Sequence, residues 1–378
     1  MTIKTTMGQL KQAIKATLVA VNSKRCDLHI KDGQVYVQAT SHSGFCRVIV
    51  STEGSSSDIA VGSISVHAAN VIFGSVAADM EVTFKPQSKG IRLRFGGSNL
   101  TLVHTDAGEA VNDLFEVTTH CTGKTLLASA TGAQLAKAFD TVQYFAAKGD
   151  VRQYLCGVLI EKEDELLKLT ATNGFSLNSV TSDVEIKKEG EFQAILPSDA
   201  AQAFDMVFKP DDEVDIFQLG TGDTRRMVWK TKNICWLTTL VAGAFPGYRS
   251  ILAGETSPLS KTWNVARKPL AAAISRVHAM SGDRYLKFIL SNESITVQSP
   301  DQLQREVVEL DQKLDDIVPF ECTASFAGEM LLDCMDQVPS EVVAFKKEAN
   351  PTSKLYLRPV ADGAEVQEWI ALIQPASI

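Results

Sequence analysis

The feature that most constrains the fold is a pattern that occurs three times along the chain. Each copy opens with an apolar stripe at helical spacing, which is typical of a helix that packs on a core. The three stripes consist of Leu10, Ile14, Leu18 and Val21, then Leu135, Phe139, Val142 and Phe145, then Leu270, Ile274 and Val277. A repeated stripe predicts a repeated structural unit.

A pair of strands and a second helix follow each stripe at nearly constant spacing. The strand pairs align at Ala39, Ala171 and Ser299, which are 132 and 128 residues apart. The second helices begin near Ser65, Pro197 and Ser325, again 132 and 128 residues apart. We therefore expect an α+β chain of three tandem domains, 1–122, 123–256 and 257–378, each with two helices packed on antiparallel sheet.

Composition and motifs exclude several classes of protein. The net charge of −8 argues against a protein that holds nucleic acid by bulk charge. The seven cysteines are scattered, and His and acidic residues form no metal-ligand pattern. Gly123-Lys124-Thr125 resembles a phosphate loop but lacks the preceding glycine, because position 118 is Thr118. No membrane span or signal peptide is evident. The sequence therefore predicts a cytoplasmic protein without cofactor, metal or catalytic residues.

Specific residues resemble a known family. Residues 150–157 read DVRQYLCG and residues 171–177 read ATNGFSL, similar to the middle domain of the bacterial DNA polymerase III β subunit, the β sliding clamp. Residues 245–252, FPGYRSIL, and the C-terminal residues 371–378 are similar to further segments of that family. The resemblance spans three domains and is closest in the second.

The resemblance implies a non-catalytic processivity factor. Two copies would join head to tail as a homodimeric ring around double-stranded DNA, with helices lining the hole. The ring would tether the replicative DNA polymerase and be opened by a clamp loader.

The candidate DNA-binding residues are mostly basic residues in the segments expected to form the first helices, 8–25, 131–152 and 262–284. Residues 8–25 carry four basic and no acidic residues. Such charges attract phosphates without reading sequence, as sliding requires. The candidates are Lys11, Lys15, Lys24, Arg25, Lys137, Lys148, Arg152, Tyr154, Arg267, Lys268 and Arg276.

The second candidate site is a partner-peptide groove between the middle and last domains, implied by the resemblance. Its residues would be Leu155, Thr172, Gly174, Phe175, Ser176, Leu177, Pro246, Ser250, Ile251, Leu372, Gln374, Pro375, Ala376 and Ser377. Phe175-Ser176 stand where the family has His-Arg, and Ser250 replaces an Arg. The tail lacks the usual Met and Arg residues. These changes predict either weak binding of the family's usual peptides or a preference for a different motif.

The third candidate site is the dimer interface. Basic residues in 89–94 and acidic residues in 301–309 lie on expected edge strands, so opposite charges favour joining domain one to domain three of another copy. The candidates are Arg92, Arg94, Leu100, Leu102, Ala279, Met280 and Glu306. By family position, Leu100 and Leu102 would meet Ala279 and Met280.

Two alternatives remain open at this point. The same repeats would also suit a peptide-binding scaffold that does not hold DNA, which the basic first helices argue against. An enzyme of unknown class is the third reading, and the absence of a catalytic motif argues against it.

Overall fold

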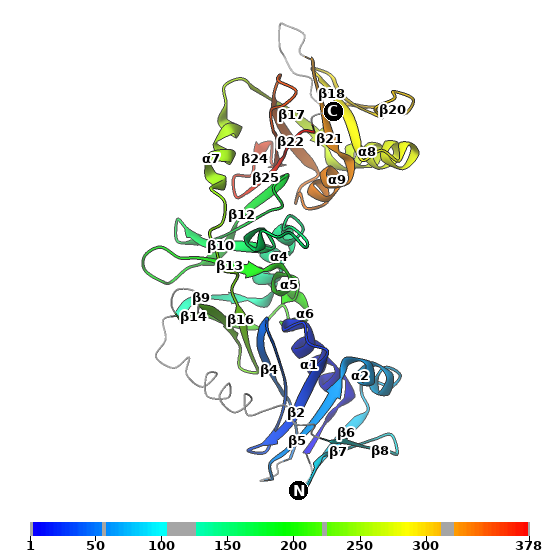
Figure 1. The fold of residues 1–378 in the computed structure, drawn as a ribbon, viewed down its shortest axis with the longest axis vertical. Helices are drawn as coiled ribbons and strands as arrows, with labels where there is room; N and C mark the ends of the chain where they lie inside the picture. Colours follow the sequence, from blue (N-terminus) through cyan, green and yellow to red (C-terminus); the bar gives the residue numbers. More distant parts are fainter. Residues whose placement is uncertain (1–2, 55–57, 104–125, 221–224, 311–320, 377–378) are drawn as a thin grey trace. The chain divides into compact units, whose positions relative to one another are not determined.

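The computed structural model describes residues 3–54, 58–103, 126–220, 225–310 and 321–376. The first repeat consists of β1 (Ile3–Thr6), α1 (Met7–Ala20), β2 (Arg25–Lys31), β3 (Gln34–Ser41), β4 (Gly44–Val50), β5 (Ala60–Ser65), α2 (Val66–Phe73), β6 (Glu81–Gln87), β7 (Gly90–Phe95) and β8 (Ser98–Val103). In this repeat α1 and α2 lie side by side, and α1 packs on β3 and β4 (Figure 1).

The other two repeats have the same order. The second consists of β9 (Leu126–Thr131), α4 (Gly132–Gln143), η1 (Gln153–Leu155), β10 (Gly157–Glu163), β11 (Leu166–Thr172), β12 (Ser176–Glu185), β13 (Gln193–Pro197), α5 (Ser198–Ala201), α6 (Phe204–Val207), β14 (Glu213–Leu219), β15 (Arg226–Lys230) and β16 (Ile234–Thr239). The linker holds α7 (Tyr248–Leu252) and η3 (Ala253–Thr256). The third consists of β17 (Ser260–Ala266), α8 (Arg267–Ser281), β18 (Tyr285–Ser291), β19 (Ser294–Gln298), β20 (Arg305–Glu309), β21 (Glu321–Ala327), α9 (Gly328–Asp336), β22 (Val342–Glu348), β23 (Leu355–Ala361), β24 (Ala364–Glu365) and β25 (Trp369–Ile373).

Contacts divide the chain into two compact units rather than three. Unit one comprises 1–139, 161–167 and 183–242, and unit two comprises 140–160, 168–182 and 243–378. The three-domain division therefore stays a prediction, and its first boundary at 122/123 lies outside the described residues.

Strands of neighbouring repeats join edge to edge within each unit. Unit one holds the sheet orders β1-β6-β7-β8 and β5-β2-β3-β4-β16-β15-β14-β9, so β4 pairs with β16. Unit two holds β12-β25-β23-β22-β17 and β20-β19-β18-β21, so β12 pairs with β25. The predicted α+β class with antiparallel sheets is confirmed.

The apolar stripes seen in the sequence are the buried faces of the first helices. Leu10, Leu135 and Leu270 have no exposed surface. Helix α1 begins at a capping box in which the Thr6 hydroxyl accepts from the Gln9 amide, which satisfies a backbone donor at the helix start. The second helix of the middle repeat is interrupted, because α5 and α6 are separate short helices.

A buried lysine holds the loop between β22 and β23. Lys347 has no exposed surface, and its Nζ donates to the carbonyl oxygens of Asn350 (2.9 Å) and Ser353 (2.5 Å) and to the Ser353 hydroxyl (2.8 Å). Burial lowers the pKa of Lys347 to about 8. The ammonium is thus solvated by loop oxygens in place of water.

Alkaline pH should stabilise the wild type relative to Lys347→Met. Above pH 8 the folded chain releases the Lys347 proton before the unfolded chain does, so this contribution to the free energy of unfolding rises with pH. Between pH 8 and pH 10, the free energy of unfolding of the wild type should rise by about 1–2 kcal/mol relative to that of Lys347→Met. Urea unfolding at each pH would measure the difference. Lys232→Met, which removes an exposed lysine, is the control and should show no such gain.

Candidate functional site

The first helices carry fewer of the candidate DNA-binding residues than the sequence indicated. Helix α1 ends at Ala20, so Lys24 and Arg25 lie beyond it, and Arg25 opens β2 within 3.8 Å of Asp27. Helix α4 ends at Gln143, which leaves Lys148, Arg152 and Tyr154 on the segment that follows. The helical placement expected for Lys24, Arg25, Lys148 and Arg152 is therefore wrong, and Tyr154 lies in the short 3-10 helix η1.

Within the helices, exposure varies. Lys15 on α1 and Lys137 on α4 are exposed to solvent. Lys11 is half-buried, because its Nζ donates to the carbonyl oxygen of Val76 at 2.7 Å. Lys15 and Lys137 are thus better placed than Lys11 to meet a phosphate.

The basic residues of α8 are engaged inside the third repeat. Arg267 donates to the carbonyl oxygens of Ser340 (3.0 Å) and Met335 (3.2 Å), and Lys268 pairs with Glu341 at 2.9 Å. Arg276 forms a two-bond ion pair with Glu306, which lowers the pKa of that carboxyl. These pairs reduce the positive charge that α8 presents.

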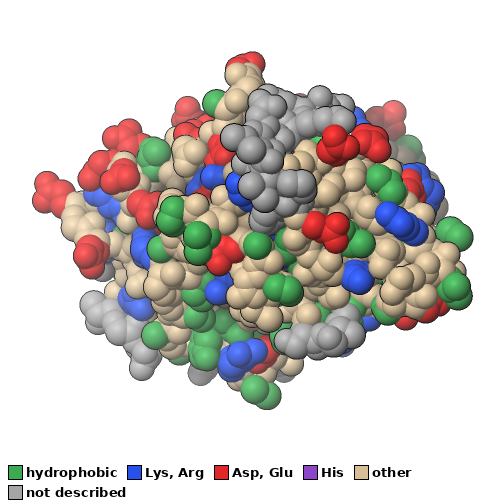
Figure 2. Space-filling model, turned by 90° about the horizontal axis from the view of Figure 1, so that it is seen from above, with side chains coloured by type: hydrophobic (Ala, Val, Ile, Leu, Met, Phe, Trp, Pro, Cys, Tyr) green, Lys and Arg blue, Asp and Glu red, His purple; other side chains and the backbone are tan. Residues whose placement is uncertain are grey.

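Charges of both signs are interspersed on the face shown in Figure 2, where Lys and Arg side chains lie among Asp and Glu side chains. This mixture agrees with the overall acidity of the chain. On this face, any attraction for a polyanion is therefore local to particular side chains.

The candidate groove contains a tight turn between β11 and β12. The Asn173 side-chain oxygen accepts from the amides of Phe175 (2.9 Å) and Ser176 (2.8 Å), and Gly174 adopts φ +90°. An asparagine at such a turn satisfies amides that the turn leaves unpaired. Thr172 Oγ1 donates to the Ser176 carbonyl oxygen at 2.7 Å. The turn leaves the Phe175 side chain 62% exposed.

The C-terminal strand closes onto this turn. Leu177 lies opposite Leu372 in the antiparallel β12–β25 pair. Beyond that pair, the Gln374 amide donates to the Phe175 carbonyl oxygen at 2.8 Å. Pro375 and Ala376 are half-buried, and Ser377 lies outside the described residues.

The candidate groove residues divide into buried and accessible sets. The buried residues are Leu155, Thr172, Ser176, Leu177 and Leu372. Exposed or half-buried residues are Gly174, Phe175, Pro246, Ser250, Ile251, Gln374, Pro375 and Ala376. A ligand can therefore meet the second set directly, whereas the first set forms the base of the site.

Helix α7 carries Ser250 and Ile251 next to the same sheet. The Tyr356 hydroxyl on β23 donates to the Ile251 carbonyl oxygen at 3.0 Å, and β23 pairs with β25. Lys168 on β11 lies 5.9 Å from the centre of the Tyr248 ring. These contacts bring the three separate segments of the candidate groove together.

Arg152, a candidate DNA-binding residue, lies instead beside the groove turn. A Cβ on Gly174 would be 3.6 Å from the Arg152 guanidinium. Asp150 accepts from Arg152 Nε (3.0 Å) and Nη2 (2.8 Å), and these bonds lower the pKa of Asp150 to about 2. The position of Arg152 beside the turn was not predicted, although its place in the DVRQYLCG segment was the available signal.

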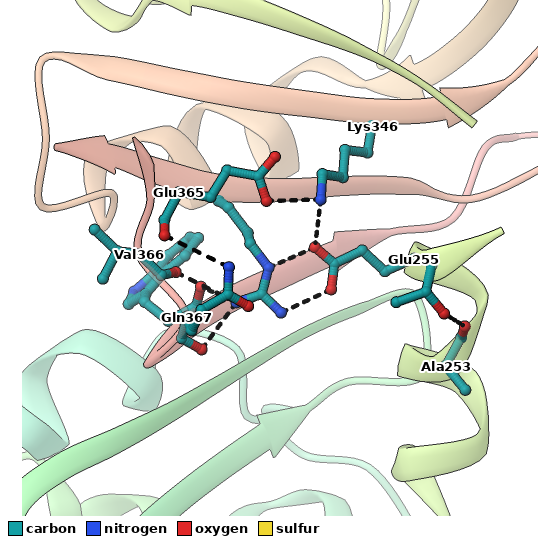
Figure 3. Close-up of polar contacts among 9 residues, drawn as sticks. Ala253, Glu255, Lys346, Glu365, Val366 and Gln367 are labelled. Atoms are coloured by element: carbon teal, nitrogen blue, oxygen red, sulfur yellow. Dashed lines mark hydrogen bonds and ion pairs between the residues drawn. The ribbon is translucent and has the colours of Figure 1, made fainter. Parts of the chain in front are cut away.

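A buried ion-pair cluster ties the linker to the third repeat (Figure 3). Glu255 of η3 is 7% exposed and accepts from Arg358 through both carboxylate oxygens, and from Lys346 Nζ at 3.2 Å. Lys346 also pairs with Glu365 at 2.6 Å. Burial raises the pKa of Glu255, but the bonds and charges of Arg358 and Lys346 outweigh it and lower the pKa overall. Sequence reasoning missed this cluster.

The candidate dimer-interface residues lie on or near two strands at sheet ends. β8 ends its sheet and carries Leu100 and Leu102, whereas β20 ends another sheet and carries Glu306. Ala279 and Met280 are exposed at the end of α8, with Met280 70% exposed.

Three details differ from the expected interface. Arg92 and Arg94 are exposed but lie on β7, which is flanked by β6 and β8 and is not an edge strand. Leu102 is only 5% exposed and packs over Gly62, so it is not an open knob. Leu303 and Val307, which are 78% and 44% exposed near or on β20, are apolar residues that were not among the candidates.

Comparison with known proteins agrees with this architecture. Residues 130–247 match the family model for the central domain of the DNA polymerase III beta subunit. The beta sliding clamp of Buchnera aphidicola subsp. Rhopalosiphum padi is 29% identical over 145 residues, 38% of each chain. That of Pseudomonas aeruginosa is 26% identical over 255 residues, 66% of this chain and 65% of the relative. The matched stretch thus spans less than two thirds of either relative.

Solved structures extend the likeness of the fold to the whole chain. The DNA polymerase III subunit beta of Pseudomonas aeruginosa superposes with a TM-score of 0.81 at 20% identity, covering 100% of both chains. The beta chain of Streptococcus pneumoniae gives 0.80 at 18% identity, again over 100% of both chains.

The tandem repeats and their edge-to-edge junctions thus give the chain the fold of these solved beta subunits. Within that fold, residues 130–247 are similar to the central domain of the DNA polymerase III beta subunit, and a matched stretch of 255 residues is 26% identical to a beta sliding clamp. No helix in the described ranges combines the length and apolar character needed to cross a bilayer.

Proposed function

We propose that this chain is a DNA polymerase processivity factor, a non-catalytic ring that encircles double-stranded DNA. The observation that carries the proposal is the threefold repeat with its two strand junctions, joined to the family match at 130–247. Three domains, 1–122, 123–256 and 257–378, would form half of the ring, and a second copy would complete it. Replication takes place in the bacterial cytoplasm, so the protein would act there.

Exposed basic residues would supply a weak, sequence-independent attraction for DNA. Lys15, Lys24, Lys137 and Lys148 are exposed, and so are Lys268 and Arg276 of α8, which form surface ion pairs with Glu341 and Glu306. Each phosphate contact contributes about one unit of slope to the dependence of binding on salt. We therefore expect weak direct DNA binding, with retention depending on ring closure.

Ring closure by a homodimer would use the two end strands, β8 and β20. Strand β4 of the first repeat pairs with β16 of the second, and β12 of the second pairs with β25 of the third. The corresponding third junction would join β20 of one copy to β8 of another. Unpaired strand edges favour such pairing, and Leu303 and Val307 would be covered by it.

The existing junctions define the register of that pairing. In the third repeat, Arg305 of β20 lies opposite Gln298 of β19. In the first repeat, Arg47 of β4 lies opposite Gln38 of β3 in the same way, so Arg305 occupies the position of Arg47. In the first repeat, Asn99 of β8 lies opposite Arg94 of β7. In the second repeat, Cys235 of β16 lies opposite Lys230 of β15 in the same way, so Asn99 occupies the position of Cys235. Arg47 pairs with Cys235. We therefore expect Asn99 of one copy to lie opposite Arg305 of the next.

The double variant Asn99→Cys/Arg305→Cys should form a covalent dimer under mild oxidation, because directly opposed Cβ atoms lie within disulfide range. Non-reducing electrophoresis would show it. In Asn99→Cys/Glu306→Cys, the register moves one cysteine to the other face of the sheet, so little cross-linking is expected. Equal cross-linking of both pairs would contradict the proposed register.

The accessible groove residues would bind short peptide segments of the replicative polymerase and the clamp loader. A solved Pseudomonas aeruginosa clamp binds griselimycin, and Helicobacter pylori beta clamps bind small aromatic compounds. Here the exposed Phe175 ring offers an apolar face, and the side-chain amide of the nearby Gln374 offers a hydrogen-bonding group. Selection from a random heptapeptide library against the wild type would provide the peptide probe.

Loading onto nicked circular DNA, followed by linearisation, tests the proposed function. A topological ring should stay on circles at high salt and leave through the ends of linear DNA. Salt-labile retention that ignores DNA ends would overturn the clamp mechanism. The alternative function is a peptide-binding scaffold that does not hold DNA. It is supported by the pairing of the basic residues of α8 with Glu341 and Glu306. A protein that fails to load onto DNA but still selects peptides would favour this alternative.

A further inference from the structure

Helix α7, one wall of the candidate groove, is too short to hold its own position. It spans five residues, Tyr248–Leu252, and Tyr248 is its buried residue. Isolated helices of this length are unstable, so tertiary contacts decide where α7 lies. The position of Ser250 and Ile251 therefore depends on what anchors α7 and the turn after it.

The first anchor is Tyr356 on β23. Its hydroxyl donates to the Ile251 carbonyl oxygen at 3.0 Å, which satisfies an acceptor at the end of the short helix. A Cβ on Gly254 would overlap the same hydroxyl, so the linker passes tightly over Tyr356.

The second anchor is the Glu255 cluster in Figure 3. The carboxylate is held by the planar fork of Arg358 and by Lys346, in the turn directly after α7. Two parallel bonds between a guanidinium and a carboxylate fix direction as well as distance. The turn that carries Glu255 is thereby held in one orientation.

The same Arg358 also reaches the opposite side of the site. Its Nη1 donates to the carbonyl oxygens of Gln367 (2.9 Å) and Trp369 (3.2 Å). Trp369 opens β25, the strand that carries Leu372 to the groove. One guanidinium thus links the linker wall to the strand at the base.

We propose that Glu255, Arg358 and Lys346 are positioning residues that set the distance between the α7 wall and the β25 base of the peptide groove. This inference rests on the proposed peptide-binding function. A buried ion pair contributes little net stability compared with apolar residues, but it can specify one arrangement. Here the arrangement it specifies is the shape that a partner peptide meets.

The test uses the full-length protein and the heptapeptide selected against the wild type. Arg358→Lys keeps the charge but loses the fork, and Glu255→Gln keeps the shape but loses the charge. Each should weaken peptide binding by about tenfold, because small errors in a preorganised site are costly. Amide hydrogen exchange in 248–256 should accelerate. Cross-linking through Asn99→Cys and Arg305→Cys, made in the same variants, should not change.

Tyr356→Phe removes one hydroxyl from the first anchor and is the milder variant if the charge variants fold poorly. It should show a smaller loss of affinity and faster exchange in the same segment. Arg226→Lys, at an exposed arginine of β15, is the matched control.

The outcomes separate this inference from the proposed function. If the wild type selects no peptide, the groove itself fails, and the inference fails with it. If the wild type binds peptide and the Glu255 and Arg358 variants bind it equally well, only the positioning role is overturned. Weaker binding without faster exchange in 248–256 would also overturn it, since the residues would then act by direct contact.

Discussion

Replacing Gly44 by alanine should weaken the junction between β4 and β16 and lower the free energy of unfolding by about 2–4 kcal/mol. Gly44 adopts φ +144°, where side chains are rare. An added Cβ would also overlap the Leu237 carbonyl oxygen on β16. Backbone on the partner strand cannot rotate away as a side chain can, so the strands have to separate.

Urea unfolding of Gly44→Ala and of Gly247→Ala would measure this effect. Gly247 has an ordinary φ, and a Cβ there would have no neighbour within 4 Å, so its substitution should be nearly neutral. Hydrogen exchange should localise the Gly44→Ala damage to β4 and β16. Comparable stability of the two variants would show that the junction tolerates a side chain at Gly44.

Removing the Arg358 guanidinium should cost a similar or larger amount of stability. In Arg358→Met, Glu255 stays buried with Lys346 as its remaining cationic partner, and the carbonyl oxygens of Gln367 and Trp369 lose their donor. Breaking one side of a buried pair typically costs about 3–5 kcal/mol. The expected result is therefore a large drop in the midpoint of urea unfolding.

The double variant Glu255→Met/Arg358→Met is the decisive control. With both charges removed, no isolated buried charge remains, so we expect most of the lost stability to return. A double-mutant cycle then gives the coupling free energy. If the double variant is no more stable than Arg358→Met, the cost comes from packing and not from the buried carboxylate that keeps Lys346 as its remaining partner.

Much of the fold follows from local sequence periodicity. The helical stripes at Leu10, Leu135 and Leu270 are buried because a repeat of three to four residues places them on one helix face. The helix ends were harder to predict. Asn22 adopts φ +46° just after α1, and a left-handed residue of this type ends a helix before Lys24 and Arg25.

The candidate sites were less accessible to sequence reasoning, because partners lie far apart in the chain. Glu255 and Arg358 are 103 residues apart, and neither forms a local pattern with the other. Arg276 looked like a ligand for phosphate because it is basic and helical, but Glu306 lies 30 residues further on and pairs with it. Local patterns predict which face is polar, whereas long-range pairing decides which charges remain available.

The two unlike end strands, β8 and β20, have a consequence for mixtures of variants. An interface between different surfaces leaves one of each kind open at every step of association, until the assembly closes on itself. A copy with a damaged β20 would still offer an intact β8. In the proposed ring it would join one wild-type copy and block its closure, so each variant copy should remove about one normal copy, and inhibition should rise in proportion to the amount of variant.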